Sequence, residues 1–290
     1  MTDLMPLGVP DRLDLGEGIR WADGRLVCVD ILTGRLLTPE GDGTAPLRTV
    51  TRLDGPLGAV APVAGRPGTW VAAAGTGVCL LTPGEDPVWL AEPERDAPTA
   101  MRMNDGCVDP HGRFWAGSMA YDGTPDAGAL YRTDSGGSVT RILAGITIPN
   151  GPAFDRDGTT MYLADSARGV VRRYPVAPRD GSLGEGEAFI EVTDGSPDGM
   201  TVDTEGALWT AVWGAGEVRR YLPDGTLGTV LHLPVSQPAG VCLGGGDGRT
   251  LYVTTARLGL AAPSPLDGAV FSARVRVPGL PTAAYRRAAG

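Results

Sequence analysis

The segments GTTMYLADSARGVVRRY (158–174) and GALWTAVWGAGEVRRY (206–221) follow one pattern. Each begins with a turn glycine, continues as an apolar strand, turns again at small residues and ends in a second strand. The other four segments that follow this pattern begin at Gly24, Gly68, Gly112 and Gly248. The six glycines are separated by 44, 44, 46, 48 and 42 residues. A period near 45 residues with several short strands per unit is typical of the blades of a β-propeller.

Six such units account for nearly the whole chain. We therefore expect an all-β fold, a single six-bladed β-propeller domain over residues 1–290, with a β-sandwich of evenly spaced strands as the alternative. A propeller ring must close, because closure removes exposed sheet edges. We expect the segment before Glu17 to pair into the last blade, beside the strand-like residues near Arg274 to Gly279.

Composition agrees with this fold and limits the partners. The chain has 44 glycines, 25 prolines and only 6% aromatic residues, which favours short strands and tight turns over long helices. A net charge of −9 argues against nucleic acid and anionic membranes as partners. We find no long apolar run and no signal-peptide pattern, so we expect a cytoplasmic monomer or small homo-oligomer.

Several common catalytic designs are excluded. All 25 basic residues are arginine, which rules out Schiff-base lysine chemistry and a Walker P-loop. The sequence also contains neither a G-x-S-x-G elbow nor a G-x-G-x-x-G dinucleotide loop. The four cysteines, which fit no zinc spacing, are interpreted as buried thiols: Cys28, Cys79, Cys107 and Cys242.

Oxygen-bearing side chains recur in nearly one register of the repeat. The only two asparagines, Asn104 and Asn150, each lie eight residues before a turn glycine. Asp198 also lies eight residues before its turn glycine, and Glu17 lies seven before Gly24. Equivalent positions of a propeller point to the common axis. We therefore expect these four side chains to converge at one mouth of the central channel.

This convergence predicts a site for a hard metal ion. Carboxylate and amide oxygens suit Ca²⁺, Mg²⁺ or Mn²⁺, and Zn²⁺ remains an alternative. The other two blades carry small or apolar residues in this register, at Gly58 to Val60 and at Ala239 to Gly240, which leaves room for a substrate. Turn capping is the alternative for each oxygen singly, but it does not explain the shared register.

The repeats also match a known family. The chain resembles the senescence-marker-protein/gluconolactonase/luciferin-regenerating-enzyme family of regucalcin-like sugar lactonases. The segments that carry the resemblance extend from the first blade to the last: LGEGIRW (15–21), RMNDGCVDPHGRFWAGSM (102–119), IPNGPAFDRDGTTMYLADS (148–166), PDGMTVDTEGALWTAVWGAGEVRRY (197–221) and, more weakly, YVTTAR (252–257).

The resemblance implies roles for individual residues. It implies a six-bladed propeller with one catalytic divalent cation, whose ligands would be Glu17, Asn150 and Asp198. Asp198 would also be the candidate general base. Arg102 would hold substrate oxygens, and Asn104 would lie beside the metal and contact the substrate or a metal-bound water.

One segment departs from the family pattern. Where a lid often supplies acidic substrate contacts, this chain reads AYDGTPDAGALY (120–131). Asp122 is the candidate contact there, and the segment has less acid than regucalcin-like chains. This difference leaves the identity of the sugar open.

The resemblance implies hydrolysis of a small-molecule sugar-acid lactone. The metal would polarise the lactone carbonyl and Asp198 would take a proton from water. Two alternatives stay open. The same site could act on another ester, a phosphotriester or a specialised metabolite, or the chain could be a non-catalytic calcium-binding propeller, because fold alone does not give function.

Overall fold

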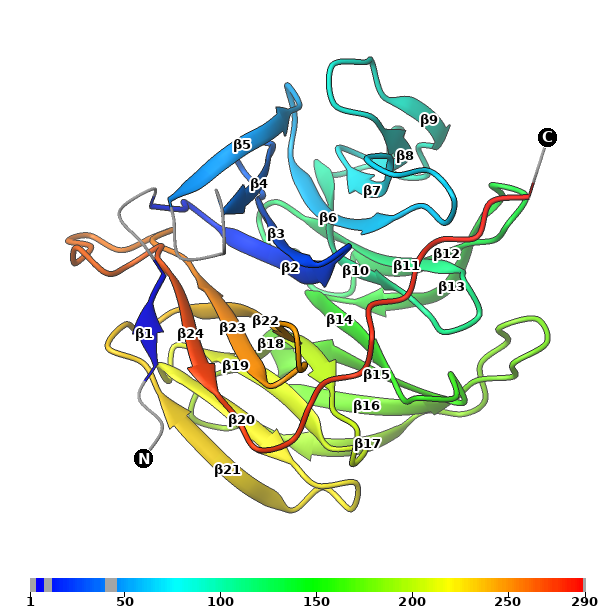
Figure 1. The fold of residues 1–290 in the computed structure, drawn as a ribbon. Helices are drawn as coiled ribbons and strands as arrows, with labels where there is room; N and C mark the ends of the chain where they lie inside the picture. Colours follow the sequence, from blue (N-terminus) through cyan, green and yellow to red (C-terminus); the bar gives the residue numbers. More distant parts are fainter. Residues whose placement is uncertain (1–3, 8–11, 40–45, 289–290) are drawn as a thin grey trace.

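Six four-stranded antiparallel sheets surround a central channel in the computed structural model, which describes residues 4–7, 12–39 and 46–288 (Figure 1). The innermost strand of each sheet contacts the innermost strands of the two neighbouring sheets, so the ring is continuous. These strands are β2 (Gly16–Ala22), β6 (Leu57–Pro62), β10 (Met101–Val108), β14 (Pro149–Phe154), β18 (Ser196–Val202) and β22 (Pro238–Gly244). The predicted six-bladed propeller is confirmed.

Each blade adds three strands outward from the channel. The second strands are β3 (Arg25–Asp30), β7 (Trp70–Ala74), β11 (Phe114–Ala120), β15 (Thr160–Asp165), β19 (Leu208–Trp213) and β23 (Thr250–Thr255). The third strands are β4 (Arg35–Pro39), β8 (Gly77–Leu81), β12 (Gly128–Thr133), β16 (Val170–Pro175), β20 (Glu217–Tyr221) and β24 (Val270–Arg274). The outermost strands are β5 (Leu47–Arg52), β9 (Val88–Ala91), β13 (Val139–Ile146), β17 (Glu187–Glu191), β21 (Leu227–His232) and β1 (Met5–Pro6).

The repeated glycines lie where the sequence places them, in the turns between first and second strands. All six have positive φ, from 67° at Gly158 to 89° at Gly112. Glycine reaches this region without the clash that a Cβ would cause. In two blades an aspartate fixes the same turn, because Asp109 and Asp203 each accept a hydrogen bond from a tryptophan indole six residues later.

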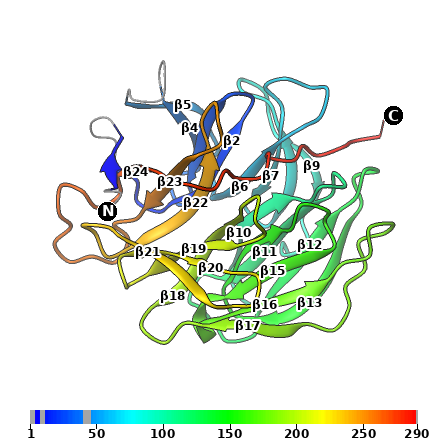
Figure 2. The ribbon, with the colours of Figure 1, turned by 60° about the horizontal axis from the view of Figure 1, so that its bottom comes forward.

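The N-terminal strand β1 closes the ring. It pairs with β24, with Met5 opposite Ser272 and Pro6 opposite Phe271, and the two strands lie side by side in both views (Figures 1 and 2). The predicted closure into the last blade is confirmed, but its location needs correction. The pairing lies at 271–272, because the chain leaves the blade after Arg274, and Gly279 instead pairs with Asp203 of the fifth blade.

The C-terminal segment, residues 279–288, crosses the face of the propeller on the turn side (red in Figure 1). Its backbone bonds reach four blades: Gly279 N donates to Gly248 O, Leu280 N to Val202 O, Tyr285 N to Pro62 O, and Arg286 N to Gly112 O. We call this segment the C-terminal strap. It connects blades that are not neighbours and so reinforces the ring from one side.

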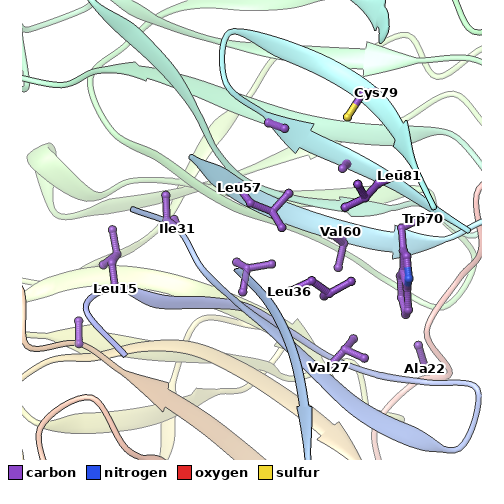
Figure 3. Packing of buried hydrophobic residues seen from close by; sticks show 14 residues of the cluster. Leu15, Ala22, Val27, Ile31, Leu36, Leu57, Val60, Trp70, Cys79 and Leu81 are labelled. Carbon is purple, nitrogen blue, oxygen red and sulfur yellow. The ribbon is translucent and has the colours of Figure 1, made fainter. Parts of the chain in front are cut away.

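Both faces of each blade are buried against the next blade. Between the first two blades, Val27 and Leu36 pack with Leu57, Val60 and Trp70 (Figure 3). Most residues of the first and second strands are therefore buried, without the alternation of buried and exposed positions that a one-sided sheet shows. The described helical residues comprise one short 3₁₀ turn, η1 (Ser166–Arg168), and no described helix is long and apolar enough to cross a membrane.

The strap yields a stability prediction at Tyr285. This side chain is fully buried between the second and third blades, and its hydroxyl donates to Asp134 O at 2.6 Å. Tyr285→Ala should lower the free energy of unfolding by about 3–5 kcal/mol through the cavity it leaves. Tyr285→Phe, the matched control, should cost only about 0.5–1.5 kcal/mol. Urea unfolding measures both, and equal losses in the two variants would contradict a packing role.

Candidate functional site

A β-bulge interrupts the start of each innermost strand. In the first and fourth blades the pairing with the second strand breaks after Glu17 and after Asn150. In the third and fifth blades the breaks follow Met103 and Pro197, directly before Asn104 and Asp198. Bulges re-aim side chains out of the regular alternation. The four oxygen-bearing side chains of the shared register therefore all stand at these breaks or directly before them.

These side chains meet at one mouth of the channel. Glu17, Asn104, Asn150 and Asp198 line one cavity of about 240 Å³, together with Arg102. All five residues are buried. The structure thus brings together every predicted site residue except Asp122, and neither histidine lines this cavity.

A chain of hydrogen bonds fixes the two asparagines. Arg102 Nη1 donates to Asn104 Oδ1 at 2.7 Å, and Asn104 Nδ2 donates to Asn150 Oδ1 at 2.8 Å. Asn150 Nδ2 in turn donates to Ser166 Oγ at 2.8 Å, and Ser166 Oγ donates to Pro197 O, next to Asp198. Both side-chain amides are therefore oriented by their partners. Asn150 Oδ1 accepts the hydrogen bond from Asn104 Nδ2. An amide oxygen has two lone pairs, so this oxygen can also accept a second bond or a metal ion.

The blades approach closely around this site because small residues separate them. A Cβ on Gly58 would lie 2.2 Å from Asn104 O, and a Cβ on Gly240 would lie 3.3 Å from Glu17 Oε2. Gly199, directly after Asp198, has the same role, since its Cβ would lie 2.8 Å from Ala239 O. The two blades without oxygen ligands thus supply backbone surface, which keeps the site narrow.

The two carboxyl groups of the site perturb each other. Burial, followed by the charges of Asp198 and Asp105, raises the pKa of Glu17 well above its usual range. Burial and the charge of Asp105 raise the pKa of Asp198 to about 8. Desolvation and like charge both disfavour the ionised form. A cation between Glu17 and Asp198 would remove that penalty.

The residues present fit a hard divalent cation. Within the described residues Asp198 Oδ1 is buried and has no hydrogen-bond partner, although buried carboxylate oxygens are normally satisfied. Two carboxylates and an amide oxygen converge at this point, which is an all-oxygen donor set. Within the described ranges, no three His, Cys, Asp or Glu side chains lie together in a group that could hold a metal ion.

Two residues of the site were missed by the sequence analysis. Asp105 is buried next to Asn104, and Ser166 on η1 supports Asn150. A carboxylate inside the predicted inner strand RMNDGCV was a usable signal for Asp105, because buried carboxylates need partners. Ser166 gave no such signal, since its position depends on the turn between β15 and β16.

Asp122 lies apart from the cavity. It is exposed on the turn after β11, and it accepts hydrogen bonds from Thr124 N at 3.0 Å and Thr124 Oγ1 at 2.6 Å. The cavity wall on this side is formed by Met119. Asp122 therefore does not line the cavity.

A second cavity, of about 180 Å³, lies at the other end of the channel beneath the C-terminal strap. Cys107 and Cys242 line it, and burial raises the pKa of both thiols to about 12. A thiol with such a pKa supplies little nucleophilic thiolate. The second cavity lacks the paired carboxylates of the first.

Comparison with known proteins agrees with this geometry. The family model described as the SMP-30/Gluconolactonase/LRE-like region matches residues 15–257, from the first to the last blade. The chain belongs to this family. The predicted resemblance is confirmed, and the match includes every residue that lines the candidate site except Leu258.

Three relatives illustrate the range of the family. The chain is 35% identical to a 6-deoxy-6-sulfogluconolactonase of Pseudomonas putida over 277 residues, which cover 91% of this chain and 92% of that protein. It is 37% identical to an L-arabinolactonase of Azospirillum brasilense over 207 residues, which cover 68% and 67%. The crystal structure of regucalcin from Agrobacterium tumefaciens, described as a calcium-binding protein, superposes with a TM-score of 0.88 at 31% identity and 95% coverage of both chains.

Proposed function

We propose that this chain is a divalent-metal-dependent hydrolase that opens a sugar-acid lactone. The observation that carries the proposal is the buried pair Glu17 and Asp198 beside the Asn150 amide, in one cavity with Arg102 and Asn104. Relatives named as lactonases of two different sugar acids support the substrate class. The candidate cations are Ca²⁺, Zn²⁺, Mn²⁺ and Mg²⁺, held by Glu17, Asn150 and Asp198.

When bound there, a divalent cation polarises the lactone carbonyl and stabilises the oxyanion of ester hydrolysis. We assign Asp198 as the general base as well, which is the role that the family resemblance implies for it. The Nη1 group of Arg102 donates hydrogen bonds to Met103 O and to Asn104 Oδ1. The rest of its guanidinium is then available to hold substrate oxygens.

The outer wall of the cavity defines how the substrate is held. Leu15, Ile148, Trp213 and Leu258 form an apolar rim above the polar floor. These four side chains cannot form hydrogen bonds to the lactone hydroxyls through polar groups other than the Trp213 indole, so we assign that role to the polar lining, with Arg102 and Asn104 as the principal contacts. Asp122 remains a proposed contact only for a substrate that extends beyond the cavity.

A substrate panel tests this proposal. Acid release in weak buffer would be followed for a 1,5-lactone such as D-glucono-1,5-lactone, a pentono-1,4-lactone, an aryl ester and a phosphotriester, with spontaneous hydrolysis subtracted. We expect metal-loaded protein to open at least one sugar lactone with kcat/KM at least about tenfold above that for the other two classes.

The other outcomes separate the alternatives. If the aryl ester or the phosphotriester is turned over faster than both lactones, the lactonase assignment would be replaced by one of these activities at the same site. Metal-loaded protein that is inert on all four substrates would favour a calcium-binding propeller without catalysis.

A further inference from the structure

An ion pair between the buried Asp105 and the half-buried Arg20, which also lines the second cavity, lies next to the candidate metal site. Arg20 follows Glu17 by three residues on β2, and Asp105 follows Asn104 on β10. Arg20 Nη2 lies 3.3 Å from Asp105 Oδ1 and donates to Gly106 O at 2.6 Å. Arg20 Nη1 donates to Ile19 O at 2.7 Å. The guanidinium thus links the first blade to the third.

Asp105 extends the link to the fourth blade. Its Oδ1 accepts from Gly106 N at 2.7 Å, and its Oδ2 accepts from Gly151 N at 3.1 Å. Gly151 directly follows the proposed ligand Asn150. The pair therefore touches the backbone of three blades within three residues of Glu17, Asn104 and Asn150.

The position of this pair distinguishes it from the other buried pairs of the propeller. Arg113–Asp109 and Arg220–Asp203 each connect residues of a single blade. Arg20–Asp105 instead crosses between blades that are not neighbours, beneath the two carboxyl groups. A buried ion pair is weak evidence for stability as such, because desolvation offsets its attraction. Its hydrogen bonds to three blades indicate another role.

We propose that Arg20 and Asp105 are positioning residues that hold Glu17, Asn104 and Asn150 in the geometry needed to bind the divalent cation. This inference rests on the proposed function and assigns residues outside the ligand set. Groups that orient metal ligands without touching the metal commonly change metal affinity by 10–100-fold.

Charge and geometry predict opposite effects at Arg20. If Arg20 acted only through its positive charge, its removal would tighten the binding of a cation nearby. If it acts by holding the strands, its removal weakens binding. Arg20→Lys separates the two further, because it keeps the charge but offers a point donor in place of the planar fork.

The test is calorimetric titration of chelator-stripped protein with Mn²⁺ and Ca²⁺ alone, without substrate. We expect Arg20→Met and Asp105→Asn each to weaken binding at least tenfold, and Arg20→Lys to weaken it severalfold. The double variant should bind the cation as tightly as the weaker-binding of the two single variants, because both substitutions break the same Arg20–Asp105 link. Arg220→Met, in a pair within the fifth blade, is the matched control and should bind as the wild type does.

The other outcomes would overturn either the positioning role alone or the metal centre as well. Tighter binding by Arg20→Met, or wild-type affinity in Arg20→Lys, would overturn the positioning role while leaving the metal centre in place. If Arg20→Met does not fold, the lysine variant decides alone. A wild-type protein that binds neither cation would overturn the metal centre and this proposal together.

Discussion

Asp198→Asn should reduce kcat/KM for the lactone by at least about 10³-fold. The change removes one of two carboxylates from the proposed metal site and removes the assigned general base, and a general base alone contributes about 10²–10⁴-fold. Asparagine keeps the shape of the side chain, so the loss would reflect charge and proton transfer. Initial rates of acid release, measured at saturating metal, check this prediction.

The same variant should not be less stable without metal. Burial and the charge of Asp105 raise the pKa of Asp198, so its ionised form is unfavourable in the metal-free protein at alkaline pH. An amide removes that cost, and we expect a melting temperature at or above that of the metal-free wild type at pH 9. Asp224→Asn, an exposed turn residue that accepts from Thr226 N, is the matched control for charge and should keep full activity. Full turnover by Asp198→Asn would exclude Asp198 from catalysis.

The fold was predictable because the residues that define the repeat have strong conformational preferences for turns and strands. Six glycines at nearly constant spacing all occupy turns with positive φ, where other residues are strained. The apolar strands between them are buried on both faces, as in the contact of Leu57 with its neighbours in Figure 3. Local and tertiary preferences agree at these positions, so the sequence pattern identifies the blades.

The convergence of the site was predictable for the same reason. Glu17, Asn104, Asn150 and Asp198 share one register of the repeat, and the symmetry of the ring brings one register to one mouth. The bulges that aim these side chains do not follow from residue types alone. Their presence at the start of every innermost strand appears only in the strand pairing.

Features that depend on contacts between distant segments were not predictable. The partner of Asp105 is Arg20, which lies 85 positions away and in another blade. The C-terminal strap binds four blades through backbone atoms, which carry no residue-specific signal. Asp122 was predicted as a substrate contact from the family resemblance. Its carboxylate instead accepts a hydrogen bond from Thr124 N in its own turn, because short polar side chains readily bond to nearby backbone N–H groups.

Removal of the metal should abolish activity in the wild-type protein. The proposed mechanism has no nucleophilic side chain, so the chain's own residues supply only a base and donors for substrate oxygens. After chelation and buffer exchange we expect less than about 1% of the lactonase rate, a loss of at least about 2.7 kcal/mol in transition-state stabilisation. Adding back Ca²⁺, Mn²⁺, Mg²⁺ or Zn²⁺ separately should restore turnover and rank the cations. Undiminished turnover in stripped protein of verified metal content would refute metal dependence.

The pH dependence of metal binding provides an independent check on the same removal experiment. Glu17 and Asp198 have raised pKa values in the metal-free fold, so protons compete with the cation below about pH 8. For each proton that the metal displaces, the apparent dissociation constant should therefore increase about tenfold per pH unit as the pH is lowered from 8 to 6. The folded metal-free chain also binds more protons than the unfolded chain between the ordinary carboxyl pKa of 3.8 and about 8. Its stability should consequently fall as pH rises through that window, and bound metal should remove the fall. Metal affinity independent of pH between 6 and 8 would show that these carboxyl groups are not the ligands.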